Sequence, residues 1–389
     1  MERYDTQSMA NIPAQDKLDA LCGALELSYS EFDSLIADNS PVFRTIKGHC
    51  FEAVFQNVLA QNGIQSLDVG GDSDTDISVN GYGLQLKTPN LAGTTSSICE
   101  YKTHKTHGAK SEGESMDYYH RIDDFADFFV GLVSYSPFKV LIIPKKDLPR
   151  HHSDSQYISS PFRLNWKDEF ARYVNAFDAL GVKMKRIDLS SIIAGKKELL
   201  PKTAIKAGLT TDIVLNTILR EENFRIWDMS IRGFAREIVI KRILNDIGVK
   251  FTDEPKTIRP ERGEKADMAI MRKDSIAFVQ IKGVSVRKCK FNGLDSLIAV
   301  ETQLTRGRVN DHPTQSRLYL YSDFDYLFLA LDPPISFLVY GRFEWSVFLI
   351  PSDKLTRHFR FNNRYSSFQQ FVARDLEEYK LSQNKQCLF

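Results

Sequence analysis

The chain has 389 residues, a length that favours two or three domains over a single core. Apolar residues make up 42% and charged residues 26%, which is ordinary for a globular protein, and 26 Phe and 15 Tyr can fill substantial cores. The formal net charge of +1 neither supports nor excludes nucleic acid as a partner, because carboxylates at a metal site cancel basic residues elsewhere.

Cysteine usage and hydropathy exclude further classes. The five Cys are scattered and odd in number, without a CxxC spacing, which predicts a reduced cytoplasmic protein without a disulfide framework or zinc cage. The longest apolar run, residues 327–340, is interrupted by Asp332 and two prolines, so no membrane span is expected. The N-terminus lacks the apolar core of a signal peptide.

The first elements expected are amphipathic helices over residues 1–40. The next helix carries Gly48 four residues before Glu52, and its apolar spacing runs to Gly63, where a strand begins. The second half repeats this order after helices at about 204–232, with Gly233, Glu237 and Gly248. The offset between the two helix-ending glycines is 248 − 63 = 185.

The next landmark begins with an aspartate. It is followed by a short strand, a hairpin-like turn and a second strand that ends in Gln-x-Lys. In the first half these are Asp76, Gln85 and Lys87. In the second half they are Asp267, Gln280 and Lys282, and the lysine offset is 282 − 87 = 195. Gly81-Tyr-Gly83 is interpreted as the turn, since no helix follows it to form a phosphate loop.

A polar stretch follows in each half, 103–108 and 302–307, at an offset of 305 − 106 = 199. Basic residues gather there: Lys102, His104, Lys105, His107, Arg306 and Arg308. They suit contact with DNA phosphates or base edges, and the alternative is a solvated loop.

Buried strands then start at Asp124-Phe125 and Asp323-Phe324, and an Ile-Pro strand closes each half. The prolines are 351 − 144 = 207 residues apart, and histidines follow them: His151, His152 and His358. We interpret these histidines as surface or capping residues, because no other ligand spacing supports zinc. An offset that grows along the chain indicates a diverged duplication, with domains at 1–195 and 204–389.

The repeated residues suit phosphodiester hydrolysis. Residues two apart in a strand share a face, so Gln85 and Lys87 emerge together, with Asp76 from a paired strand and Glu52 from the helix beside them. Such oxygen ligands suit a hard cation, and the lysine can stabilise transition-state charge. The plainer alternative is a solvent-facing glutamine and a surface helix glutamate.

This pattern resembles the PD-(D/E)XK nuclease superfamily, and the later strands are similar to the C-terminal parts of type II restriction endonucleases. The resemblance implies an α/β fold with two domains, each a central mixed sheet flanked by helices, and Mg²⁺ as cofactor. It also implies roles in each half: metal-binding aspartates, glutamines at the variable ligand position, catalytic lysines and helix carboxylates. The implied metal-binding aspartates are Asp76 and Asp267, and the glutamines at the variable ligand position are Gln85 and Gln280. The implied catalytic lysines are Lys87 and Lys282, and the helix carboxylates are Glu52 and Glu237.

The sequence departs from the common motif in two ways. Glutamine replaces the usual Asp or Glu, and Thr75 and Ala266 stand where proline precedes the aspartate. A neutral amide weakens a metal site, so the helix glutamate becomes more important, and Asp72 and Asp74 are alternative ligands.

The expected function is a type II restriction endonuclease that cuts double-stranded DNA, one strand per domain, as a monomer or homodimer. The resemblance implies a cognate DNA methyltransferase. One alternative has one catalytic domain, with the other binding DNA or exerting allosteric control. Others are a non-catalytic DNA-binding or scaffold protein, and a repair, recombination or RNA nuclease.

Overall fold

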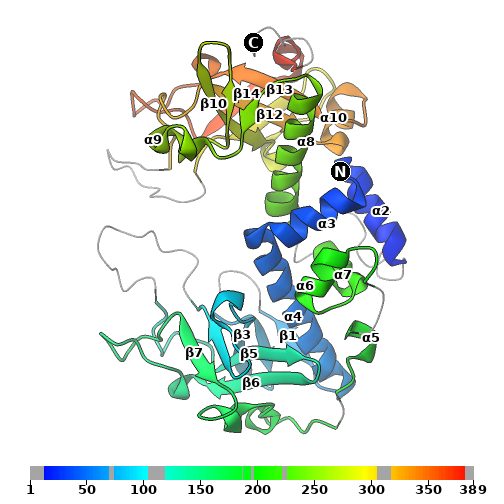
Figure 1. The fold of residues 1–389 in the computed structure, drawn as a ribbon, viewed down its shortest axis with the longest axis vertical. Coiled ribbons are helices and arrows are strands. Elements are labelled where there is room, and N and C mark those ends of the chain that lie inside the picture. Colours follow the sequence, from blue (N-terminus) through cyan, green and yellow to red (C-terminus); the bar gives the residue numbers. More distant parts are fainter. Residues whose placement is uncertain are drawn as a thin grey trace. The chain divides into compact units, whose positions relative to one another are not determined.

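The computed structural model describes residues 13–69, 74–103, 119–185, 187–193, 197–220, 226–304 and 317–381. It divides into two compact units, Met1–Leu18 with Asp33–Trp227 and Asp19–Phe32 with Asp228–Phe389. Each unit holds a mixed five-stranded sheet flanked by helices, which confirms the predicted α/β class (Figure 1). Within the described residues, no helix is long and apolar enough to cross a membrane.

Between residue 13 and the first sheet lie three helices: α2 (Ala14–Leu25), α3 (Tyr29–Asp38) and α4 (Ser40–Gln61). Asn39 caps α4 by accepting the Val42 N–H at 3.3 Å, and Pro41 stands in the first turn, where no N–H is needed. The helix stops beside Gly63, whose φ of 73° lies in the left-handed region that favours glycine, as its position in the sequence predicted.

The first sheet has the order β1-β2-β3-β5-β6. Its strands are β1 (Ser66–Asp68), β2 (Ile77–Val79), β3 (Tyr82–Lys87), β5 (Phe128–Tyr135) and β6 (Phe138–Pro144). The β3–β5 pair is parallel and the other neighbours are antiparallel. A separate antiparallel ribbon pairs β4 (Ile98–Tyr101) with β7 (Phe162–Asn165).

The second unit repeats this topology strand for strand. Its sheet runs β8-β9-β10-β12-β13, again with one parallel pair, β10–β12. The strands are β8 (Phe251–Thr252), β9 (Met268–Met271), β10 (Ile276–Gly283), β12 (Tyr326–Leu331) and β13 (Ser346–Pro351). The ribbon pairs β11 (Leu297–Glu301) with β14 (Phe368–Val372), and α8 (Arg232–Asp246) packs on β10 as α4 packs on β3. A π-helical turn, Ile226–Ile231, leads into α8.

Strand register corrects one landmark of the repeat. Gln85 lies beside Phe129 and Gln280 beside Leu327, so these strands are offset by 327 − 129 = 198 rather than 199. The Asp-Phe pairs lie just before these strands. Between the Asp-Phe pair and the paired strand residue, the first half has one residue more than the second, which accounts for the difference of one in the offset. The offset then grows by 207 − 198 = 9, because α10 (Pro333–Tyr340) is inserted between β12 and β13.

The units divide at a different point from the expected linker at 195–204. The helices α5 (Ser190–Ile193), α6 (Pro201–Ala207) and α7 (Thr211–Leu219) belong to the first unit. The Asp33 carboxylate accepts the backbone N–H groups of Lys202 and Thr203 at 2.9 Å, and buried Cys50 lies 3.4 Å from the Thr217 hydroxyl. These contacts hold α6 and α7 in the first unit, so the division falls after Trp227. Two short helices, α9 (Pro260–Gly263) and α11 (Ala373–Leu376), belong to the second unit.

Each sheet rests on its own hydrophobic core. The phenylalanines that the sequence placed in buried strands are indeed buried: Phe125, Phe128, Phe129, Phe324 and Phe328. Tyr101 and Phe162 of the β4–β7 ribbon pack against Phe129 in the first core. The ribbon therefore covers one face of the sheet and fixes β5 beside the strand that carries Gln85 and Lys87.

Candidate functional site

The predicted cluster of the first half is assembled at the join of β2 and β3. Asp76 donates its backbone N–H to Leu84 O at 2.9 Å, which fixes its position across the hairpin. Its Oδ2 accepts hydrogen bonds from Leu86 N at 2.6 Å and Gln85 Nε2 at 2.7 Å, and Lys87 Nζ lies 3.6 Å away. The aspartate is thus held by three successive residues of β3.

The second half builds the same arrangement. The Asp267 backbone N–H donates to Val279 O at 2.9 Å, and its Oδ2 accepts from Ile281 N at 2.7 Å and from Gln280 Nε2. Lys282 differs from its counterpart, because its Nζ lies over the ring of Tyr319, 5.5 Å from the ring centroid. The sequence did not single out Tyr319, which lies before a buried strand and carries no motif.

Both glutamines are buried, which overturns the alternative that they face solvent. Gln85 is 5% exposed and Gln280 is 2% exposed. Among the described residues, Gln280 Oε1 has no hydrogen-bond partner, since the amide nitrogen is turned to Asp267. Burying an unpaired carbonyl oxygen costs about 1–3 kcal/mol, and a cation bound there would remove that cost.

The charged groups of both sites have shifted pKa values. Burial raises the pKa of Asp76 and of Asp267, while Lys87 and Lys282 respectively oppose the rise. Burial, assisted by the Asp267 carboxylate, raises the pKa of Glu237 to about 7. Burial also lowers the pKa of Lys282. Because burial disfavours the charged forms of these carboxylates, an added positive charge would favour their ionisation.

The helix carboxylates lie near their aspartates, as predicted. Glu52 acts electrostatically on Asp76, and Asp267 acts on Glu237. Glu52 has a further partner that the sequence reading missed, because its Oε2 lies 2.9 Å from His49 Nδ1. Burial lowers the pKa of His49, but Glu52 and Asp76 raise it by more, so the net shift is upward. The signal was the i, i+3 spacing of His49 and Glu52 on one helix face.

Each half thus offers two carboxylates and a buried amide, which fits a hard divalent cation. Among the described residues, no group of three or more His, Cys, Asp or Glu could hold a metal ion. The alternative ligand Asp74 is occupied, with its Oδ2 2.9 Å from His120 Nδ1. Asp72 lies outside the described residues.

The histidines after the Ile-Pro strands have a structural role. His151 Nδ1 accepts the backbone N–H of Ser153 at 3.3 Å, and His358 Nδ1 accepts that of Arg360 at 3.1 Å. Each histidine side chain thus accepts the backbone N–H of the residue two positions later and closes a short turn. The capping interpretation is therefore confirmed for His151 and His358. The His152 ring contacts the His151 ring in a tilted arrangement, with ring centroids 4.5 Å apart.

One of the six predicted DNA-binding residues lies in the described part of the chain. Lys102 is described, follows β4 and is exposed. Five others lie outside the described residues: His104, Lys105, His107, Arg306 and Arg308. Glu301, at the end of β11, acts electrostatically on Lys282 and is a further acidic residue that the motif reading missed.

Comparisons with known proteins add little to this geometry. No family matches the sequence, and no curated protein matches it. Among solved structures, the chain is similar to the bacterial homing endonuclease I-Ssp6803I at 14% identity and a TM-score of 0.27. That match covers 41% of this chain and 92% of the endonuclease. A likeness at this level carries no argument about activity, so function rests on the site.

Proposed function

We propose that this protein is a magnesium-dependent endonuclease that hydrolyses phosphodiester bonds of double-stranded DNA, with one site in each unit. The observation that supports it is the repetition of one arrangement. In both halves an aspartate accepts from the backbone and amide N–H groups of the strand that bears the lysine. A chance surface pattern would not be buried twice with the same partners.

The metal would be held by Asp76, Gln85 and Glu52 in the first unit and by Asp267, Gln280 and Glu237 in the second. When bound, it supplies Lewis-acid activation of the phosphoryl group and a more acidic water. Gln280 Oε1 is a free acceptor for it among the described residues. Glutamine also suits this position because its amide donates to the neighbouring aspartate, where a second carboxylate would repel it.

The lysines act on the reacting phosphate itself. A water oxygen forms a bond to phosphorus, and the bond from phosphorus to one sugar oxygen breaks, which leaves a phosphate monoester and a hydroxyl. Lys87 and Lys282 each lie two residues beyond the glutamine of the same strand, and so on the same strand face, fixed by the strand backbone. A cation held there stabilises the charge that grows on the phosphate oxygens, or orients the attacking water.

Two sites in one chain match the two strands of a duplex. We propose the finer assignment of a type II restriction endonuclease in which each unit cuts one strand. A cognate methyltransferase would then protect host DNA. The differing loops of the two halves would allow an asymmetric recognition sequence.

The test compares wild type with Lys87→Ala, Lys282→Ala and the double variant on unmethylated phage DNA and supercoiled plasmid. Lys183→Ala, an exposed lysine remote in sequence from both motifs, is the matched charge control. We expect discrete fragments from wild type and Lys183→Ala, nicked plasmid from each single variant, and no product from the double variant or in EDTA.

Other outcomes separate the alternatives. Loss of all cutting in one single variant, with full double-strand cutting by the other, would leave one catalytic unit and one DNA-binding or allosteric unit. Cleavage of branched, single-stranded or RNA substrates alone would indicate a repair or RNA nuclease. Duplex binding without cleavage of any substrate would replace the proposal with a non-catalytic DNA-binding protein.

A further inference from the structure

Arg236 of α8 packs against the end of β10. It precedes Glu237 in the helix, and it meets the backbone at Gly283, the residue after Lys282. A Cβ atom added at Gly283 would overlap Cζ, Nε and Nη1 of Arg236. The guanidinium therefore occupies the space that any other residue at position 283 would fill with its own side chain.

This placement puts a second cation beside the catalytic lysine. Arg236 acts electrostatically on both Lys282 and Glu237, two of the groups proposed to carry the chemistry. Its charge is permanent, and its planar fork of N–H donors fits two oxygens of one phosphate, which a lysine ammonium cannot do. A phosphodiester bound at this site would therefore meet two cations beside the proposed catalytic carboxylates.

The first unit has no equivalent at the matching, described positions. The repeat offsets place Phe51 opposite Arg236 (236 − 185 = 51) and Thr88 opposite Gly283 (283 − 195 = 88). Phe51 is fully buried in α4. At these positions, the arginine and the glycine therefore occur together only in the second unit. The glycine leaves the space that the arginine guanidinium occupies.

We propose that Arg236 binds a phosphate of the DNA at the second-unit site, and that Gly283 is glycine in order to seat its guanidinium. This rests on the proposed nuclease function, and it makes the two sites unequal. The second site would hold its strand by both Lys282 and Arg236, whereas the first would rely on Lys87.

The activity test uses the Lys87→Ala background, in which only the second site cuts. Arg236→Gln should lower nicking by about 10²–10³-fold, the usual effect of removing one fixed donor to a reacting anion. Arg236→Lys should recover part of the loss through charge alone. Thr88→Ala in the Lys282→Ala background is the matched control, and it should nick at its parent rate.

Gly283→Ala tests whether the space beside Gly283 positions the guanidinium, without removing the arginine. It should reduce nicking as Arg236→Gln does, and it should add no further loss when Arg236 is already Gln. Equal losses of nicking from Gly283→Ala with Arg236 and with Gln at position 236 would mean that the glycine is needed only for the backbone conformation. That result would overturn the proposed pairing of Gly283 with Arg236. Thermal unfolding of each variant separates this from misfolding, since a purely structural Arg236 would lower Tm and leave nicking per folded molecule unchanged.

Duplex binding, measured by fluorescence anisotropy without magnesium, gives a readout independent of catalysis. Loss of one phosphate contact should reduce the slope of log affinity against log salt by about 0.9 in Arg236→Gln. An unchanged slope together with unchanged nicking would overturn the role of Arg236 while leaving the nuclease proposal intact. Wild type that neither binds nor cuts DNA would overturn both.

Discussion

At the scale of single residues, the buried glutamine is the feature that sets these sites apart. The sequence located Asp76, Gln85 and Lys87 correctly as a cluster, because strand alternation dictates which residues share a face. It could not decide whether Gln85 faced solvent or the site, since burial depends on the strands that pack beside β3. It also missed His49 and Tyr319, whose roles arise only from tertiary contact.

Glu237 leads to a prediction about pH. Its folded pKa of about 7 lies above its ordinary value of 4.5, so its contribution to stability is complete below about pH 4.5 and is lost as pH rises to 7. In EDTA, wild type should therefore lose stability across this range relative to Glu237→Gln. Urea unfolding at several pH values measures the difference. Parallel pH profiles for the two proteins would contradict the raised pKa.

Magnesium should reverse this effect if the proposed ligand set is correct. A cation favours the ionised form of Glu237, so Mg²⁺ at pH 8 should stabilise wild type more than Glu237→Gln. The measurement is the shift in urea midpoint on adding Mg²⁺. An equal shift in both proteins would remove Glu237 from the ligand set.

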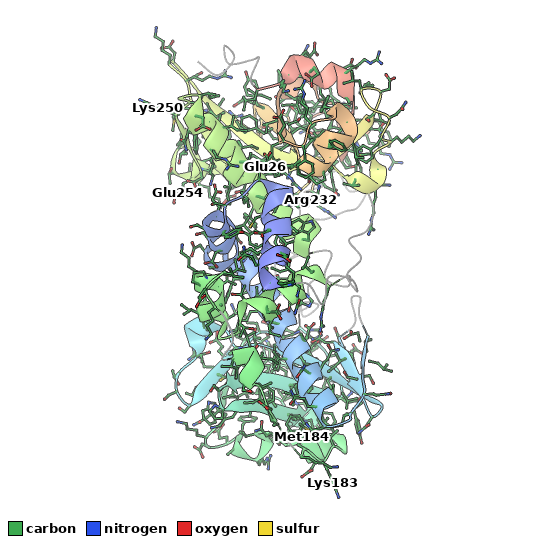
Figure 2. All side chains as sticks on the ribbon, turned by 90° about the vertical axis from the view of Figure 1, so that its right-hand side faces the viewer. Glu26, Lys183, Met184, Arg232, Lys250 and Glu254 are labelled. Carbon is green, nitrogen blue, oxygen red and sulfur yellow. The ribbon has the colours of Figure 1, made fainter. Side chains whose placement is uncertain are left out.

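A buried ion pair at the start of α8 gives a prediction about stability. Arg232, labelled in Figure 2, is 4% exposed and Asp332 is 3% exposed, and Arg232 Nε donates to Asp332 Oδ2 at 2.6 Å. Asp332→Ala would remove the carboxylate that pairs with this buried arginine, at a cost of about 3–5 kcal/mol measured by chemical denaturation. Replacing both partners with Met and Leu should cost less. A larger loss in the double variant would contradict this account.

At the scale of elements, the sequence predicted the helix–hairpin–strand order of each half because turn residues and periodicity are local signals. It gave no pairing for the β4–β7 ribbon, in which Tyr101 lies opposite Phe162, because nothing local specifies a partner that far along the chain. The same limit produced the one-residue error in aligning the Asp-Phe landmarks. Asp127 and Asp325, and not the earlier aspartates, occupy equivalent places in the two sheets.

These two aspartates tie the parallel strands together. Asp127 Oδ2 accepts the Gly83 N–H and Asp325 Oδ2 accepts the Phe278 N–H, both at 2.9 Å. Asp325 also pairs with Arg262. Asp325→Ala should cost about 1–3 kcal/mol and speed amide exchange at Phe278, and Asp127→Ala should do the same at Gly83. Unaltered exchange at both amides would show that the carboxylates are not needed for the pairing.

At the scale of the whole molecule, the two units are not consecutive in the chain. Residues Asp19–Phe32 belong to the second unit, and Leu25 O accepts the Trp345 Nε1–H at 2.7 Å. Arg242 Nη2 donates to Glu26 O at 2.9 Å. The sequence predicted a domain boundary between residues 195 and 204, but composition cannot reveal that an early segment completes a late unit.

Removing that segment should therefore damage the distant half. With Trp166 and Trp227 changed to Phe, Trp345 fluorescence reports on the second unit alone. A chain starting at residue 33 should show an earlier urea midpoint by this probe than the full chain. Lys17→Met, which breaks the contacts of Lys17 with Asp212 and Asn216 in the first unit, is the control and should leave this midpoint unchanged. Identical midpoints for the two chain lengths would show that the segment is dispensable.

The chain passes from one unit to the other three times, after Leu18, Phe32 and Trp227. During synthesis, the second unit therefore cannot be completed from its own nascent stretch and must recruit a segment made some two hundred residues earlier. The early helices must stay available until the far end has emerged from the ribosome. The two halves, although repeats of one topology, are therefore not interchangeable: a gene cut at codon 227 would yield a second fragment that lacks Asp19–Phe32, and co-expression with the first fragment should restore the second unit.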